Sequence, residues 1–319
     1  MWFDYHGKKI NILDTPGHKD YAEDTFRTLT AVDSVIDVID VAKGVEEQTE
    51  KLVEVCRMRK IPIIVFINKL DREGKNAFDL FDEVESKLGL RLTPLSFPIG
   101  MGFNFKGIYN LWEKNIQIFE STDKQKIAKT IAFDSLESEG LKQFISETAM
   151  LELKESLELV EGVYPAFDQK EYLKGNLQPV FFGSALNNFG VQVLLDCFIQ
   201  IAPAPLPKST DKRVIKPTET AFSGFVFKIH ANMDPKHRDR LAFIKIVSGI
   251  FKRNTPYLHV RHNKKIKFSS PNTFFAKKKE VVDESFPGDI VGLHDTGTVS
   301  YTHLRAHETR GNLVCRLLL

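Results

Sequence analysis

The run Asp14-Thr15-Pro16-Gly17-His18 has residue types that could handle a phosphate group and its metal ion. It follows Lys9–Leu13, whose alternation of polar and apolar residues predicts a β-strand that delivers Asp14 at its carboxyl end. A carboxylate in that place can hold Mg²⁺ through water, and a glycine in a sharp turn lets a backbone N–H approach a terminal phosphate. Asp14 and Gly17 suit these two tasks. A plain Pro-Gly turn after a strand is the commoner explanation of such a run taken alone.

A second polar run, Asn68-Lys69-Leu70-Asp71, follows the β-branched segment Ile61–Ile67. Open α/β sheets bind ligands beyond the carboxyl ends of their strands, which is where these side chains are expected. Guanine presents N1–H and N2–H₂ as adjacent donors, and the Asp71 carboxylate can accept from both, whereas adenine lacks this donor pair. Asn68 can tie the loop and contact the base edge, and the Lys69 stem can cover the ring face. Taken singly, the run is also a common surface turn.

A third run, Gly183-Ser184-Ala185-Leu186, follows the apolar segment Pro179–Phe182. Its backbone N–H groups would reach the guanine carbonyl from a neighbouring strand. The signal is weak by itself. Three runs in this order, each expected at the carboxyl end of a strand, favour a site for GTP or GDP with Mg²⁺, in which Asp14 contacts the metal ion through water.

Alternating strand and helix signals surround these runs and predict an α/β fold with a mostly parallel sheet. After an N-terminal hairpin of Trp2–Tyr5 and Lys9–Leu13, the expected elements are helices near Tyr21–Thr30, Glu46–Arg59, Asp79–Leu88 and Val191–Ile201, and strands at Ser34–Asp40, Ile61–Ile67 and Pro179–Phe182. The pattern loosens between about residues 95 and 178, with an acidic helical stretch at Asp134–Val163. This interval is interpreted as an insertion.

The pattern changes to a period of two after a Pro-rich linker at residues 204–207, whose stiff extended conformation suits a connection between domains. Strands are expected at Phe222–Ile229, Leu241–Val247, Tyr257–Val260, Ile266–Ser269 and Val281–Val282. Glycine and asparagine residues separate them. Residues 208–298 therefore predict a small antiparallel β-barrel.

The composition narrows the class of protein. Apolar residues make up 42% of the chain and charged residues 27%, which is typical of soluble globular proteins. No apolar run is long enough to span a membrane and the first residues lack a secretory pattern, so a cytoplasmic protein without membrane association is expected. Three scattered cysteines suit a reducing compartment. Residues 208–280 hold 18 Lys or Arg against 5 Asp or Glu, which favours a polyanionic partner.

With these runs the sequence resembles the translational GTPases, whose second switch reads Asp-Thr-Pro-Gly-His, as Asp14–His18 does. The resemblance implies that His18 orients the attacking water on the γ-phosphate, which makes it the expected catalytic residue. Phosphoryl transfer depends mainly on positioning and charge stabilisation, so one oriented imidazole can matter greatly. The resemblance also implies a P-loop GTPase-type sheet within residues 1–203 and a translation-factor second domain at residues 208–298.

Within that family the sequence is most similar to the peptide chain release factor 3 branch, from about residue 3 to about residue 297. The similar runs are Glu23–Asp33, Lys43–Glu46, Glu54–Arg59, Phe66–Glu73, Pro98–Gly102, Ala185–Gly190 and Phe227–Arg240. This branch implies GTP-dependent removal of class-I peptide release factors from the ribosome, by a monomer that binds no DNA. Lys236, Arg238 and Arg240 are expected to contact ribosomal RNA phosphates, with a solvated basic face as the alternative.

Two departures from the family pattern limit what is expected of this chain. The sequence contains neither Gly-x-x-x-x-Gly-Lys-Ser/Thr, the loop that would hold the β-phosphate, nor the first switch, so the GTP-binding domain is expected to be truncated at its N-terminus. Residues 299–319 leave the family pattern and are interpreted as translated adapter sequence outside the fold. The chain by itself is expected to bind GTP weakly and to hydrolyse none detectably.

Two alternatives to the termination factor stay open. An elongation-factor-G-like ribosomal translocase shares the nucleotide motifs, but not the run Phe227–Arg240. A nucleotide-free module, in which the GTPase-like domain only docks on ribosomal RNA or protein, would keep the same domains without the chemistry.

Overall fold

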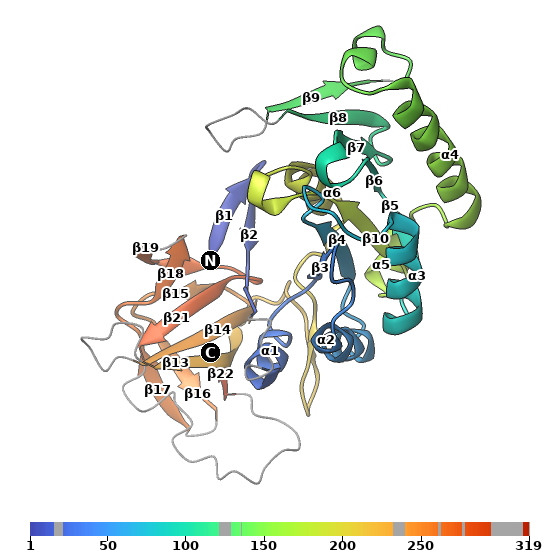
Figure 1. The fold of residues 1–319 in the computed structure, drawn as a ribbon. Helices are drawn as coiled ribbons and strands as arrows, with labels where there is room; N and C mark the ends of the chain where they lie inside the picture. The colour runs from blue at the N-terminus through green and yellow to red at the C-terminus, as the bar shows by residue number, and fades with distance from the viewer. Residues whose placement is uncertain are drawn as a thin grey trace. The chain divides into compact units, whose positions relative to one another are not determined.

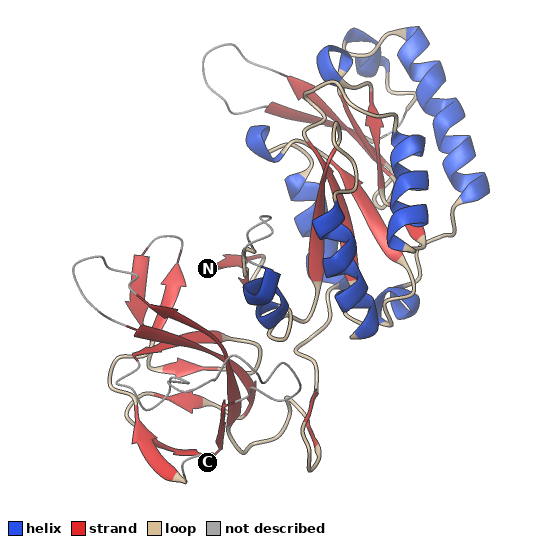
Figure 2. Cartoon of the chain, turned by 60° about the horizontal axis from the view of Figure 1, so that its bottom comes forward, coloured by secondary structure: helices blue, strands red, loops and turns tan. Residues whose placement is uncertain are grey.

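The computed structural model of the chain describes residues 1–15, 22–120, 129–134, 136–231, 240–260, 263–275, 278–294 and 315–318. Two compact units make up the chain (Figure 1). Ser34–Ala202 form one unit, here called the α/β unit, and Met1–Asp33 with Pro203–Leu319 form the other, here called the β-rich unit. Helices gather in the first and strands dominate the second (Figure 2).

A parallel four-stranded sheet is the framework of the α/β unit. Its strands lie in the order β3 (Val35–Asp40), β4 (Ile63–Asn68), β10 (Gln178–Phe182) and β5 (Leu92–Pro94). Each neighbouring pair is parallel. The first five residues of β4 are apolar and buried, as expected of a parallel strand covered on both faces. The predicted α/β class with a parallel sheet is thereby confirmed.

Three helices complete this framework: α2 (Glu47–Met58), α3 (Ala77–Leu88) and α6 (Val191–Ile201). The α3 helix shows why the sequence sets its bounds. It begins after Asn76, whose Oδ1 accepts a hydrogen bond from the Phe78 N–H at 2.9 Å, and ends at Gly89 with φ +61°. Between these caps, buried apolar residues recur at helical spacing, so α3 has one face for the core.

A second small sheet lies between β5 and β10 in the chain. It is an antiparallel meander of β6 (Ser96–Ile99), β7 (Gly107–Asn110), β8 (Asn115–Glu120) and β9 (Lys129–Phe133), with a 3₁₀ turn, η2 (Gly102–Asn104). After it come η3 (Glu139–Gln143), α4 (Glu147–Val163) and α5 (Gln169–Leu173). These elements fill the interval interpreted as an insertion at about residues 95–178, a boundary that stays a proposal.

The inserted elements differ from the sequence expectation in two ways. The interval in which the sequence pattern loosens contains four strands. In one of them, β8, Ile116 and Ile118 are buried and alternate with polar residues, as expected of a strand with one face in the core. The acidic helix begins at Glu147 rather than near Asp134. Ser146 stops it there, since its hydroxyl accepts a hydrogen bond from the Ala149 N–H at 3.2 Å and acts as the N-cap.

The β-rich unit is built on one large sheet. Its elements are α1 (Ala22–Thr28), β1 (Trp2–Tyr5), β2 (Lys8–Asn11), β11 (Lys208–Ser209), β12 (Val214–Ile215), β13 (Ser223–Ala231), β14 (Arg240–Ser248), β15 (Phe251–Lys252), β16 (Pro256–His259), β17 (Lys264–Lys267), β18 (Asn272–Phe275), β19 (Lys278–Val281), β20 (Glu284–Ser285), β21 (Ile290–His294) and β22 (Cys315–Leu318). The order in the sheet is β17-β16-β22-β13-β14-β21-β18-β1-β2, with β19 paired to β18.

Aromatic packing forms the core of this sheet. The rings of Phe251 and Tyr257 are stacked with centroids 5.1 Å apart, and Phe222 and Phe268 contact the same pair. All four rings are buried. The domain of antiparallel strands expected after the α/β domain is therefore present. Among the described helices of the whole chain, none has the length and apolar character needed to cross a lipid bilayer.

The N-terminal hairpin belongs to this sheet and not to the parallel one. β1 pairs with β2 and, through Trp2 and Phe275, with β18. The second hairpin strand, expected at Lys9–Leu13 with Asp14 at its carboxyl end, spans Lys8–Asn11, so Asp14 follows it by three residues; among the described strands β2 pairs with β1. His6 and Gly7 both have positive φ, so the turn between the strands is tight.

Asp289 anchors the hairpin to the β-rich unit. Its buried carboxylate Oδ1 lies 2.9 Å from the Lys9 ammonium and accepts a hydrogen bond from the Asn11 side chain at 3.3 Å. Its other oxygen accepts the Phe286 N–H at 3.0 Å. Asp289 is almost 280 residues from the hairpin in sequence, which is why the local pattern could not reveal these contacts.

The C-terminal strand β22 lies between β13 and β16 and is antiparallel to both. Sequence reasoning placed residues 299–319 outside the fold, which stays a prediction, although Cys315–Leu318 pair with two strands of the sheet. An extended segment can satisfy the backbone N–H and C=O groups that β13 and β16 would otherwise present at an open edge. Residues 295–314 and 319 lie outside the described part of the chain.

Candidate functional site

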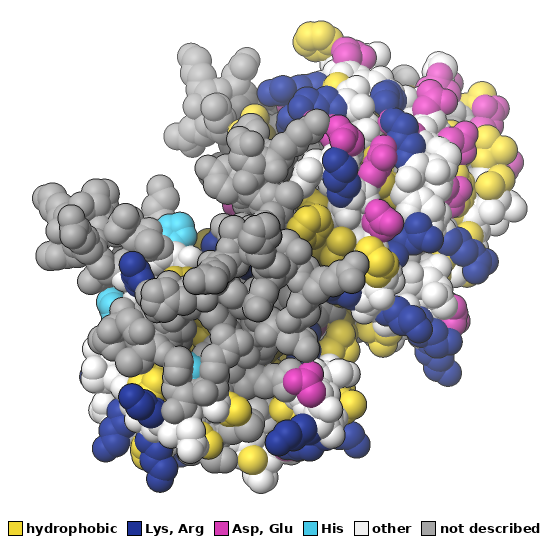
Figure 3. Space-filling view, turned by 90° about the horizontal axis from the view of Figure 1, so that it is seen from below, with side chains coloured by type: hydrophobic (Ala, Val, Ile, Leu, Met, Phe, Trp, Pro, Cys, Tyr) yellow, Lys and Arg dark blue, Asp and Glu magenta, His cyan; other side chains and the backbone are white. Residues whose placement is uncertain are grey.

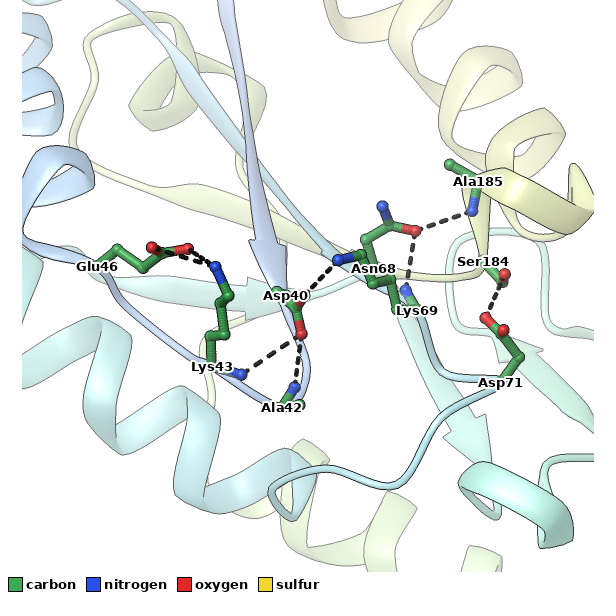
Figure 4. A network of polar contacts seen from close by, with 9 residues as sticks. All are labelled: Asp40, Ala42, Lys43, Glu46, Asn68, Lys69, Asp71, Ser184 and Ala185. Atoms are coloured by element: carbon green, nitrogen blue, oxygen red, sulfur yellow. Dashed lines mark hydrogen bonds and ion pairs between the residues drawn. The ribbon is translucent and has the colours of Figure 1, made fainter. Parts of the chain in front are cut away.

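Two of the predicted polar runs meet at one edge of the parallel sheet. Asn68–Asp71 follow β4, and Ser184–Leu186 follow β10, where Ala185–Asn187 form a 3₁₀ turn, η4. β4 and β10 are adjacent and parallel, with Ile67 opposite Phe182. Strands in this register end at the same level, so the two loops are brought side by side (Figure 4).

Asn68 joins the two loops. Its Oδ1 accepts a hydrogen bond from the Ala185 N–H at 2.8 Å and another from the Lys69 N–H at 2.8 Å. Lys69 has φ +69°, a conformation that non-glycine residues seldom adopt and that the second of these bonds helps to hold. The Ala185 N–H, expected to be available to a guanine carbonyl, is thus used to fix the loop.

Asp71 faces the second loop. The Ser184 hydroxyl donates a hydrogen bond to Asp71 Oδ1 at 2.5 Å and accepts one from the Asn187 side chain at 2.9 Å. Ser184 is fully buried, and Asp71 is half-buried. Within the described residues Asp71 Oδ2 accepts no hydrogen bond, so it can accept from donors on a ligand.

Backbone contacts beneath these side chains hold the loops at a fixed spacing. Gly183 donates to the carbonyl of Ile67 at 2.9 Å, and its own carbonyl accepts the Leu70 N–H at 3.2 Å. Leu70 is completely buried, which shows that it supports the loop from below. A Cβ at Gly183 would lie 2.4 Å from the Phe189 carbonyl oxygen and 2.8 Å from the Phe66 ring. Only glycine fits there.

Asp40 belongs to the same network, although it was not predicted as a site residue from the sequence. Its Oδ2 lies 2.5 Å from the Lys69 ammonium, and its Oδ1 accepts the N–H groups of Ala42 at 2.9 Å and Lys43 at 3.4 Å. Partial burial alone would raise the pKa of Asp40, but the hydrogen bonds from Lys69, Ala42 and Lys43 outweigh it and lower the pKa. The available signal was its position as the last residue of a strand beside β4.

The other predicted site residues make none of the contacts described above. Asp14 is exposed and Thr15 half-buried after β2, in the β-rich unit, and Pro16, Gly17 and His18 lie outside the described residues. Leu186 is 68% exposed at the tip of its loop. Of the three basic residues predicted to contact RNA, Arg240 is exposed at the start of β14, and Lys236 and Arg238 lie outside the described residues.

The described residues give little support to a metal site. They contain one oxygen ligand of the predicted set, the Asp14 carboxylate. No three His, Cys, Asp or Glu side chains converge elsewhere in the part of the chain that the structure describes. A single exposed carboxylate does not by itself hold Mg²⁺, which is usually bound through one or two carboxylates together with substrate phosphates.

Comparison with known protein families shows the family to which the chain with this site belongs. Residues 1–204 match the family described as the elongation factor Tu GTP binding domain. The chain belongs to the translational GTPase family. Residues 221–302 of this translational GTPase match a second family, described as elongation factor G domain 2. The GTP-binding match covers both loops of the polar network, and it implies that the family ligand is a guanine nucleotide.

A crystal structure of a protein from Thermus thermophilus has a similar fold. That protein is 18% identical to this translational GTPase with a TM-score of 0.70, and the match covers 100% of this chain and 45% of that protein. At this identity the likeness concerns the fold alone. The chain spans less than half the length of that relative.

Proposed function

We propose that the Asn68–Asp71 and Ser184–Leu186 loops form the guanine-recognition site of this translational GTPase. The observation that carries the proposal is the pairing of Asp71 Oδ1 with the buried Ser184 hydroxyl at 2.5 Å. This contact orients the carboxylate, so that the remaining oxygen can accept the N1–H and N2–H₂ donors of guanine. Lys69 supplies an alkyl stem for the ring face, and Leu186 supplies an exposed apolar side chain beside it.

For the complete factor we propose GTP hydrolysis on the ribosome, in translation termination. Asp14, Thr15, Pro16, Gly17 and His18 would then be the second switch, with His18 orienting the attacking water and Asp14 contacting Mg²⁺ through water. Class-I peptide release factors would be the proteins removed. The support for this finer role is the sequence similarity to release factor 3, above all in Phe227–Arg240. The family matches are equally consistent with an elongation-factor-G-like translocase.

Replacing Asp71 tests guanine recognition in the chain as it stands. Asp71→Asn turns one acceptor into a donor, which suits the C2 carbonyl of xanthine better than the amino group of guanine. We expect the affinity for GDP to fall at least about tenfold, equivalent to about 1.4 kcal/mol, and the affinity for xanthosine diphosphate to rise. Titration calorimetry measures both. Asp79→Asn, an exposed acid on α3, is the charge-matched control.

Two results of that titration would oppose the proposal. Equal losses for GDP and ADP in the Asp71→Asn chain would show that Asp71 does not read the base. Absence of GDP binding at millimolar concentration by the unchanged chain would favour the nucleotide-free docking module.

A release assay tests the termination role in the complete factor. Ribosomes carrying a labelled class-I release factor would be mixed with the factor and GTP, and the departure of the label followed in time. We expect GTP-dependent acceleration. A factor that moves messenger RNA on the ribosome but leaves the departure rate unchanged would be a translocase, and the termination proposal would be abandoned.

A further inference from the structure

The Lys69 side chain is tethered at both ends. At its backbone, the N–H donates to Asn68 Oδ1 and the residue has φ +69°, so the direction in which the side chain leaves the loop is set. At its tip, the ammonium lies 2.5 Å from Asp40 Oδ2. Figure 4 shows the side chain running from its loop towards Asp40, away from Asp71 and Ser184.

Asp40 is itself rigidly held. It ends β3 at the level of Asn68 in the neighbouring strand, and the N–H of Val41 donates to the Asn68 carbonyl at 3.0 Å. Its carbonyl accepts the Gly44 N–H at 2.8 Å, and its Oδ1 is used by Ala42 and Lys43. The Asp40 side chain is only 16% exposed. Oδ2 is therefore left to hold one partner in one direction.

We propose that Asp40 is a positioning residue for the guanine ring, which acts by tethering the Lys69 ammonium so that the lysine stem is already extended before the base arrives. The inference rests on the proposed function. A free lysine samples many rotamers, and ordering it on binding costs affinity, whereas a tethered stem is preorganised. Neutralising the ammonium also leaves the stem as an apolar surface for the ring face.

A nearby ion pair offers a matched comparison. Lys43 lies 3.3 Å from Glu46, in the loop that follows Asp40, but both side chains are more than half exposed. Exposed pairs of this kind hold their partners weakly. The Lys43–Glu46 pair has similar chemistry nearby, but among the described residues its side chains form no hydrogen bond or ion pair with the Asn68–Asp71 loop.

The first part of the test measures the tether without any nucleotide. The full chain is treated with an amine-acetylating reagent, and the rates at Lys69 and Lys43 are read by peptide mass mapping. We expect Lys69 to react several-fold more slowly than Lys43, and Asp40→Asn to remove the difference. Glu46→Gln should leave Lys69 unchanged. Equal rates at the two lysines in the unchanged chain would overturn the tether.

The second part measures GDP affinity in a double-mutant cycle. Asp40→Asn should weaken binding about three- to fivefold, the upper part of the range measured for exposed ion pairs, because Asp40 is largely buried. Lys69→Met keeps an unbranched stem without the ammonium, so in that background Asp40→Asn should have no further effect. An Asp40→Asn effect that persists in the Lys69→Met chain would mean a merely structural role, and an unchanged affinity in Asp40→Asn would overturn positioning.

The two parts separate failure of the inference from failure of the proposed function. Absence of GDP binding by the unchanged chain refutes guanine recognition and, with it, the positioning role. Normal GDP binding with no effect of Asp40→Asn refutes the positioning role alone. Thermal denaturation of each variant shows that it is folded before its affinity is compared.

Discussion

Asp37 is an acid on β3 that has no place in the polar network of the candidate site. Its Oδ2 is buried and, in the described part of the chain, has no hydrogen-bond partner. Burial raises the pKa of Asp37 to about 7. Burial, and after it the Asp37 carboxylate, raises the pKa of Cys56, on α2, to about 12.

This raised pKa predicts a pH-dependent stability. The folded chain binds the Asp37 proton more tightly than the unfolded chain, whose pKa stays near 3.8. Folding stability should therefore fall as pH rises from about 4 to about 7 and then level off, losing at most roughly 4 kcal/mol. In Asp37→Asn that part of the fall should vanish. Chemical denaturation at pH 5, 6, 7 and 8 measures the difference between the two curves.

Glu54→Gln is the control for that experiment, because Glu54 is exposed on the same helix, α2. Its curve should keep the slope of the unchanged chain. If Asp37→Asn and the unchanged chain lose stability in parallel between pH 5 and pH 7, Asp37 is not buried as a neutral acid.

At the scale of elements, the local sequence pattern predicted the helices and strands whose bounds are set by hydrophobic periodicity and by capping residues. The β-branched run Ile61–Ile67 and the capped helices around it have strong periodicity, and their bounds in the structure differ from the expected ones by at most two residues. The same holds for α6, which spans Val191–Ile201 as expected. The alternation of strands and helices along the chain predicts a parallel sheet. In such a sheet adjacent strands end at the same edge, so β4 and β10 bring the Asn68 and Ser184 loops together.

Pairing over long distances could not be predicted from local pattern. The hairpin at the N-terminus was recognisable, but its place depends on Asp289 and on β18, which lie far along the chain. The meander β6–β9 was hidden by Pro98 and by glycines that resemble loop signals. Asp40 was missed for a related reason, since its partner Lys69 is 29 residues away and becomes visible only in the register of β3 with β4.

For the whole molecule, the unequal distribution of charge is the main physical property. Residues 208–280 carry 18 Lys or Arg against 5 Asp or Glu. In the face shown in Figure 3, acidic side chains lie mainly over the α/β unit, and the β-rich unit displays Lys and Arg with few acidic neighbours. In the β-rich unit, Lys264, Lys265 and Lys267 on β17 are exposed, as is Arg240 on β14. Such a surface suits a polyanion.

This charge predicts salt-dependent binding of RNA by the β-rich unit. Each basic residue that neutralises a phosphate releases counterions and contributes roughly 0.7 to 0.9 to the slope of log affinity against log salt. Arg240→Ala should weaken binding of the full chain to an RNA stem-loop and reduce that slope by about one. Lys154→Ala, which removes an exposed cation from the acidic helix α4, should change neither quantity. Fluorescence anisotropy between 50 and 200 mM salt, roughly the range over which such contacts are screened, measures both.

Equal effects of the two substitutions would mean that RNA responds only to net charge, and Arg240 would then lose its assignment as a phosphate contact.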